Sequence, residues 1–153
     1  MHRNNQAETA EFLRSLVIGI KPDLVALTGP LLDADALAIA DALKSNGRGK
    51  LVSSEENASG ADLTVTTGEH TEQELRRLVS ATQEGGVIVI LGAAPKLPGR
   101  ETALAMEREG IISMLLLPIG GGVALIQKRG QKAGKHAGST PAERALGGII
   151  QPY

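Results

Sequence analysis

The chain contains no cysteine and no tryptophan, and Phe12 and Tyr153 are its only aromatic residues. The absence of cysteine excludes disulfide bonds, thiolate nucleophiles and thiolate metal ligands. Sites that stack flat rings or nucleobases usually recruit aromatic side chains, and only these two residues near the chain ends can serve. The core must therefore be aliphatic.

Long apolar runs and an excess of charge of one sign are also missing. No run approaches the roughly 18 apolar residues typical of a membrane span, and the amino terminus lacks the apolar core of a signal peptide. The 17 acids and 16 cations give a formal net charge of −1, which predicts no general attraction to nucleic acid or membranes. We expect a cytoplasmic protein without a membrane or nucleic-acid partner.

Alternating strand and helix patterns are present along most of the chain. Thr71 and Glu74 have the spacing of a capping box, and Gly85-Gly86 is expected to end the helix that they open. Unbroken apolar strands between helices indicate a parallel sheet that is covered on both faces. Helices are predicted over 7–19, 33–44, 71–84 and 100–109, and strands over 24–28, 50–54, 61–66 and 87–91.

The stretch GIISMLLLPIGGGVALIQKR predicts a β-hairpin. Two apolar runs, 111–119 and 123–126, flank Gly120-Gly121-Gly122, and glycines tolerate the positive φ angles of tight turns. The triple glycine lies between two strands rather than before a helix, so it is a turn and not a phosphate-binding loop. The expected fold class is α/β, a Rossmann-like doubly wound, mostly parallel sheet with a C-terminal antiparallel hairpin.

Composition changes after Arg129, which divides the chain into a domain over 1–129 and an extension over 130–153. From Lys128 onward, five cations and one acid give a net charge of +4. An anion contact and a solvated, flexible tail are the two interpretations, and the lack of interleaved aromatic residues favours the tail. Thr140 followed by Pro141 predicts a short helix within it.

Several stretches resemble class I S-adenosylmethionine-dependent methyltransferases, in particular the catechol and caffeoyl-CoA type O-methyltransferases. They are TAEFLRSLVIGIKPDLVAL, GRGKLVSSEEN, LRRLVSATQEGGVIVIL and, most specifically, LLLPIGGGVALIQKR. The resemblance covers residues 9–129 with gaps. It implies a methyl-donor fold, S-adenosylmethionine as the cofactor and a homodimer.

The resemblance also implies positions for the cofactor. The family holds the methionine part with a glycine-rich turn after the first strand, which is Thr28-Gly29 here, because glycine permits close backbone approach. The acid that holds the ribose hydroxyls corresponds to Glu55 or Glu56, and Gly92 opens the loop after the family's fifth strand. The acid that the family places before the first turn is Ala26 in this chain.

The metal site of the metal-dependent members is not retained in the sequence. An aspartate at the end of the family's fourth strand corresponds to Thr66 and Thr67, and the acid–amide pair after the fifth strand corresponds to Gly92-Ala93. A hard cation needs several carboxylate oxygens, so we expect no metal. His70 is the remaining candidate for a catalytic base.

A deletion separates this chain from the family pattern. Only residues 55–60 lie between the second and third predicted strands, where the family has a helix, a strand and another helix. A parallel crossover normally needs a dozen or more residues, so the link is taut and extended or the two strands are not both parallel. Either arrangement leaves the edge of strand 50–54 bare, and a bare edge favours pairing with a second chain.

These observations predict a methyltransferase-like protein that has lost cofactor binding and catalysis and acts as a binding or dimerising module. A small-molecule ligand and a homodimer are its expected partners. The alternative is a minimal S-adenosylmethionine-dependent O-methyltransferase acting on a small molecule, with Thr28, Gly29, Glu55 and Gly92 at the cofactor and His70 as base. A third hypothesis is anion binding at helix amino termini, near Asp33 or Thr71.

Overall fold

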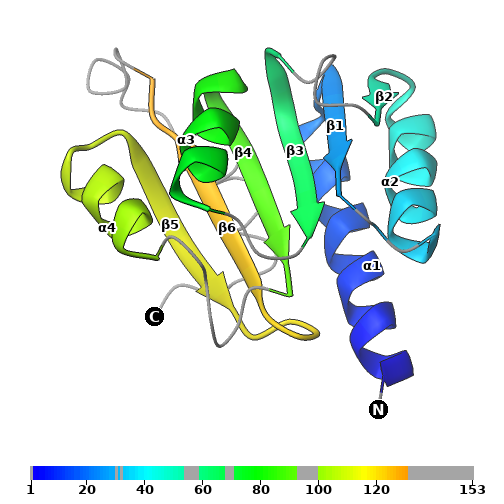
Figure 1. The fold of residues 1–153 in the computed structure, drawn as a ribbon. Helices are drawn as coiled ribbons and strands as arrows, with labels where there is room; N and C mark the ends of the chain where they lie inside the picture. Colours follow the sequence, from blue (N-terminus) through cyan, green and yellow to red (C-terminus); the bar gives the residue numbers. More distant parts are fainter. Residues whose placement is uncertain are drawn as a thin grey trace.

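The structure is a computed structural model that describes residues 2–29, 31, 33–53, 59–67, 71–92 and 100–130. Helices and strands alternate through most of this part, as expected from the sequence (Figure 1). The elements are α1 (His2–Ile20), β1 (Leu24–Thr28), α2 (Asp33–Asn46), β2 (Lys50–Val52), β3 (Ala61–Thr67), α3 (Glu72–Ala81), β4 (Thr82–Leu91), α4 (Arg100–Arg108), β5 (Ile112–Leu117) and β6 (Val123–Lys128).

The six strands form one sheet in the order β2-β1-β3-β4-β6-β5. β2, β1, β3 and β4 pair in parallel, whereas β6 pairs antiparallel with both β4 and β5. The carboxyl ends of the parallel strands and the turn between β5 and β6 therefore share one edge of the sheet, the lower edge in Figure 1. The predicted Rossmann-like fold with a C-terminal hairpin is confirmed.

Each face of the sheet carries its own helical layer. On one face, α1 and α2 pack over a cluster that includes Val87 and Val89, and on the other α3 and α4 pack over Ile88 and Ile90. Because successive side chains of a strand point to opposite faces, residues 87–91 of β4 must all be apolar to fill both layers. This explains the unbroken apolar run of β4.

The open question about the second and third strands is resolved by the pairing of β1. β1 lies between β2 and β3 and is parallel to both, so β2 and β3 run in the same direction. Residues 53–60 connect them past β1, and this link is too short for the helix, strand and helix of the family pattern. Among the described strands, β2 is the outermost on this side, as the sequence predicted.

The transition from α3 to β4 differs from the prediction. The capping box at Thr71 and Glu74 is confirmed, but α3 ends at Ala81 and not at Gly85-Gly86. Thr82 caps the helix, since its hydroxyl donates to the Leu78 carbonyl over 2.6 Å. The glycines instead lie within β4, where the register with β3 shifts, and a Cβ on Gly86 would be only 2.6 Å from Thr82 Cγ2.

Two further expectations concern the chain ends. None of the helices that the structure describes is long and apolar enough to cross a membrane. The predicted helix near Thr140 lies outside the described residues, together with the rest of 131–153.

Candidate functional site

The candidate site is the sheet edge at which β1, β3 and β4 end. Thr28 pairs with Thr66, and Thr67 pairs with Leu91. Ligands of doubly wound proteins bind at this edge, outside the carboxyl ends of the strands. We therefore consider each residue by its position relative to this edge.

Three of the four predicted cofactor residues lie at this edge. Thr28 ends β1, Gly29 follows it and Gly92 follows β4. Gly29 has a φ of +78°, and a Cβ placed on it would be 3.4 Å from the Thr67 carbonyl oxygen. The left-handed backbone thus favours glycine at this position.

The remaining predicted site residues cannot be placed. Glu55, the ribose acid, and His70, the catalytic base, both lie outside the described residues. Their roles stay predictions.

The hairpin turn contributes to the same edge. A Cβ on Gly121 would lie 4.0 Å from the Gly92 Cα, so the turn lies beside the end of β4. The backbone N–H of Gly120 donates to Glu8 Oε2 of α1 over 3.0 Å. This hydrogen bond therefore joins α1 to the hairpin turn.

Within the part of the chain that the structure describes, acidic groups are scarce at the strand ends. Ala26, which replaces the family's acid, is fully buried and packs beside Ala61. Thr28 and Thr66 are also buried. Within the described ranges no three His, Asp or Glu side chains gather closely enough to hold a metal ion, and the expectation that this protein needs no metal stays a prediction.

One acid at the start of α2 has an unusual environment. Asp35, in the first turn of α2, is 2% exposed, and its Oδ1 has no hydrogen-bond partner. Burial raises the pKa of this carboxyl group. The positive end of the helix favours an acid at such a position, which explains why the sequence pattern resembled an ordinary cap.

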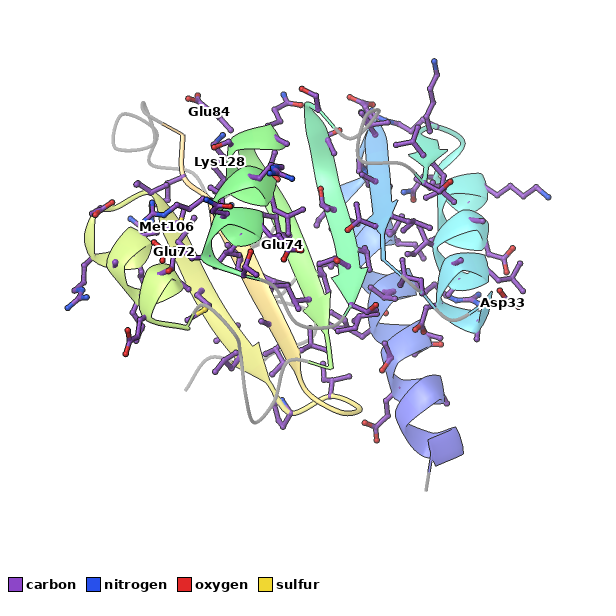
Figure 2. The ribbon with its side chains drawn as sticks, in the orientation of Figure 1. Asp33, Glu72, Glu74, Glu84, Met106 and Lys128 are labelled. Carbon is purple, nitrogen blue, oxygen red and sulfur yellow. The ribbon has the colours of Figure 1, made fainter. Side chains whose placement is uncertain are left out.

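The helix amino termini do not suit anions. α2 begins with Asp33 and Asp35, and α3 has Glu72 and Glu74 in its first turn; Figure 2 labels three of these acids. The Thr71 hydroxyl already accepts the Glu74 backbone N–H. Carboxylates at these positions would repel a phosphate, which disfavours the anion-binding hypothesis.

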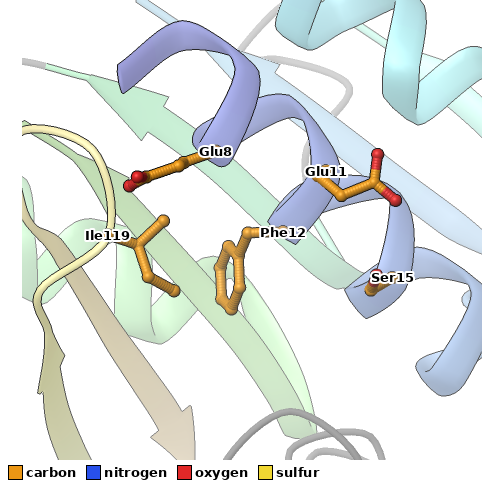
Figure 3. Close-up of a pocket in the computed structure, with 5 residues that line it drawn as sticks. All are labelled: Glu8, Glu11, Phe12, Ser15 and Ile119. Carbon is orange, nitrogen blue, oxygen red and sulfur yellow. The ribbon is translucent and has the colours of Figure 1, made fainter. Parts of the chain in front are cut away.

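A hollow of about 350 Å³, which no sequence pattern predicted, lies at this end of the molecule. It lies between α1 and the hairpin turn and is lined by Glu8, Glu11, Phe12, Ser15 and Ile119 (Figure 3). The Glu8–Gly120 contact joins residues 112 positions apart. Residues so far apart in the sequence give no local pattern that predicts their contact. The sequence does show that Glu8, Phe12 and Ser15 have the spacing of one helix face.

The described residues fit S-adenosylmethionine poorly. Gly29 permits close backbone approach, but the buried Ala26 supplies no carboxylate, and Thr28 is only 6% exposed. The Asp35 carboxyl group is enclosed as well. No methyl-transfer step follows from these side chains.

No protein-family model matches the chain, and a comparison with curated proteins finds no match. Solved structures are similar. A methyltransferase from Geobacter sulfurreducens is 17% identical, with 80% of each chain covered and a TM-score of 0.63. The O-methyltransferase TomG from Streptomyces achromogenes, in complex with S-adenosylmethionine, is 10% identical over 79% of each chain, with a TM-score of 0.55.

A third similar structure is the O-methyltransferase from Bacillus cereus in complex with S-adenosylhomocysteine. It is 12% identical, covers 78% of this chain and 80% of its own, and has a TM-score of 0.55. At these identities the similarity concerns the fold. The chain therefore has the Rossmann-like fold of class I S-adenosylmethionine-dependent O-methyltransferases, in a shortened form.

Proposed function

We propose that this protein is a methyltransferase-fold protein that has lost cofactor binding and catalysis and acts as a binding or dimerising module. One observation carries the proposal. The central parallel strands end at Thr28, Thr67 and Leu91, and the strand position of the family's acid is the buried Ala26. Where a zwitterionic cofactor needs acceptors, these strand ends offer hydroxyls and small residues.

The short link between β2 and β3 supports the same conclusion. β2 is the outermost described strand on its side, and residues 53–60 are too few for the helices and strand that the family places there. In the family pattern these elements form the adenine side of the cofactor site. A chain without them has fewer surfaces with which to enclose S-adenosylmethionine.

Calorimetry and thermal unfolding with S-adenosylmethionine and S-adenosylhomocysteine test this proposal. Ligand at about one hundred times Kd stabilises a protein by roughly 2.7 kcal/mol. We expect no shift in Tm and no heat of binding at millimolar cofactor. A saturable shift that disappears in Glu55→Ala would overturn the proposal and assign Glu55 to the ribose.

The second candidate is a minimal S-adenosylmethionine-dependent O-methyltransferase that acts on a small molecule. The left-handed Gly29 beside Thr67 favours it, because this geometry lets a ligand approach the backbone. S-adenosylmethionine would then lie along Thr28, Gly29, Glu55 and Gly92, with His70 as the base. Methyl transfer from labelled cofactor to a panel of small hydroxyl compounds would distinguish this enzyme from the module.

Homodimerisation and a cytoplasmic location are parts of the proposed function. The support for a dimer is an open sheet edge, since strand edges pair readily with other chains. Static light scattering at several concentrations tests it, with twice the monomer mass as the expected result. A monomer at all concentrations would remove dimerisation from the proposal and leave ligand binding.

A further inference from the structure

The hollow beside the hairpin has an apolar wall. Phe12 is 5% exposed and belongs to the same core cluster that Ile119 packs against. Glu8, Phe12 and Ser15 follow one another along a single face of α1, and Ile119 approaches from the hairpin turn (Figure 3). A volume of about 350 Å³ is in the range of small-molecule sites.

The rim of the hollow carries negative charge. In Figure 3 the Glu8 side chain points toward Ile119, whereas the Glu11 carboxylate points away from Phe12. The Gly120 N–H donates to Glu8 Oε2 over 3.0 Å. This hydrogen bond holds the carboxylate at the rim, and the second carboxylate oxygen, Oε1, takes no part in it. Among the described residues that line the hollow, none is a lysine or an arginine.

We propose that this hollow binds a small amphiphilic cation, an aliphatic amine with a short alkyl chain. The alkyl chain packs against Phe12 and Ile119, since apolar burial is favourable, and the ammonium group contacts Glu8 at the rim. The inference deepens and rests on the proposed function, because it names the ligand class of the binding module.

Charge complementarity selects an amine over other small molecules. An anion with the same alkyl chain would meet the Glu8 carboxylate and be repelled, and a neutral alcohol would gain only the apolar contacts. A cation gains both the apolar contacts and the ion pair. Because the hollow is open to solvent, salt weakens the ionic part of the binding.

Titration of the full chain with n-hexylamine, n-hexanol and hexanoate at low salt tests the proposal. Saturation-transfer NMR or calorimetry should show saturable hexylamine binding. We expect hexylamine to bind about two- to fivefold more tightly than hexanol, the range of a partly exposed ion pair. Hexanoate should bind more weakly than hexanol, and added salt should reduce only the advantage of the amine.

Two matched variants locate the cation. Glu8→Gln keeps an oxygen that can accept the Gly120 N–H but removes the charge, so hexylamine affinity should fall to that of hexanol. Glu109→Gln removes the same charge at an exposed position just beyond α4, outside the lining of the hollow, and should change hexylamine affinity less than about twofold. Phe12→Leu should weaken hexylamine and hexanol binding together, and circular dichroism confirms that each variant is folded.

Three results would overturn the inference. They are the absence of saturable hexylamine binding, equal binding of hexanoate, and equal losses in Glu8→Gln and Glu109→Gln. The cofactor titration on the same sample separates this inference from the proposed function. Absent amine binding without cofactor binding removes only the ligand class, whereas cofactor binding removes the module proposal whatever the amine does.

Discussion

The two edges of the sheet differ in length and chemistry. β2 has three residues, and the groove beside it is lined by Lys44, Arg48 and Leu51 among others. β5 has six residues and leaves Leu115 and Leu116 exposed by 40% and 49%. Short strands and basic side chains protect an edge against pairing, whereas a longer apolar edge invites it.

The two halves of β5 also differ from each other. The Arg129 N–H donates to the Ile111 carbonyl, so by antiparallel alternation Met114 and Leu116 direct their backbone groups away from β6. The Met114 N–H is satisfied by Glu107 Oε2 of α4 over 3.0 Å. Leu116 lies beyond this contact. The sequence predicted association at the edge of β2. The exposed leucines and the outward backbone groups of Leu116 instead favour association at the second half of β5.

The largest expected effect is a loss of stability when a buried side chain behind each edge is shortened. Ile126 on β6 is fully buried beside β5, and Ile126→Ala should lower the free energy of unfolding by about 2–5 kcal/mol. Val52 on β2 is only partly buried, so Val52→Ala should cost about 1 kcal/mol or less. Urea denaturation measures both. Equal losses would show that the β2 side is packed as tightly as the β5 side.

The second prediction concerns association. In Leu116→Lys, a charge replaces an exposed apolar residue on β5, and we expect the dimer to become a monomer in light scattering. Leu51→Lys introduces the same change on β2, where cations already lie, and should leave the dimer intact. The reverse pattern would place the interface at β2.

A smaller effect is expected at the protected half of β5. Glu107→Ala removes the acceptor of the Met114 N–H and should lower the free energy of unfolding by about 0.5–1.5 kcal/mol. Glu109→Ala, just beyond α4, removes an exposed carboxylate as a matched control. If the two variants have the same stability by urea denaturation, the Glu107 contact does not protect the edge.

The smallest effect concerns α2, the helix whose end lies beside the β2 groove. Burial raises the pKa of Asp35 in the folded state, so folding favours the protonated carboxyl group. Its contribution to stability is complete below the unfolded-state pKa and is lost as the pH rises through the folded-state value. Asp35→Asn should therefore be slightly more stable at neutral pH, by about 1 kcal/mol or less.

Thermal unfolding between pH 3 and pH 7 measures this dependence. The wild type should lose stability relative to Asp35→Asn as the pH rises. Asp33→Asn, at an exposed position of the same turn, is the control and should show no such trend. A constant difference between wild type and Asp35→Asn would contradict the prediction.

Much of the fold followed from local patterns. The capping box of α3, the apolar run of β4 and the glycine turn of the hairpin were recognised because each depends on neighbouring residues. The predicted boundary between α3 and β4 was wrong, because a glycine pair such as Gly85-Gly86 can either end a helix or form a β-bulge. Packing against Asp62 and Thr82 decided between these conformations.

Less of the candidate site could be predicted. Thr28, Gly29 and Gly92 were found through their resemblance to a family motif, and they do lie at the carboxyl edge of the sheet. The hollow at Glu8 and the enclosure of Asp35 were not found. Both depend on contacts between segments that are distant in the chain, and the spacing of residues along the sequence does not predict such contacts.

The sequence by itself determined the α/β class and the aliphatic core, because periodicity and composition carry this information. Only the tertiary structure decided that β1 separates β2 from β3, that Glu8 holds the hairpin turn, and that the apolar edge is β5. The physical reason is that strand order, exposure and contacts over 112 residues are properties of the packed chain.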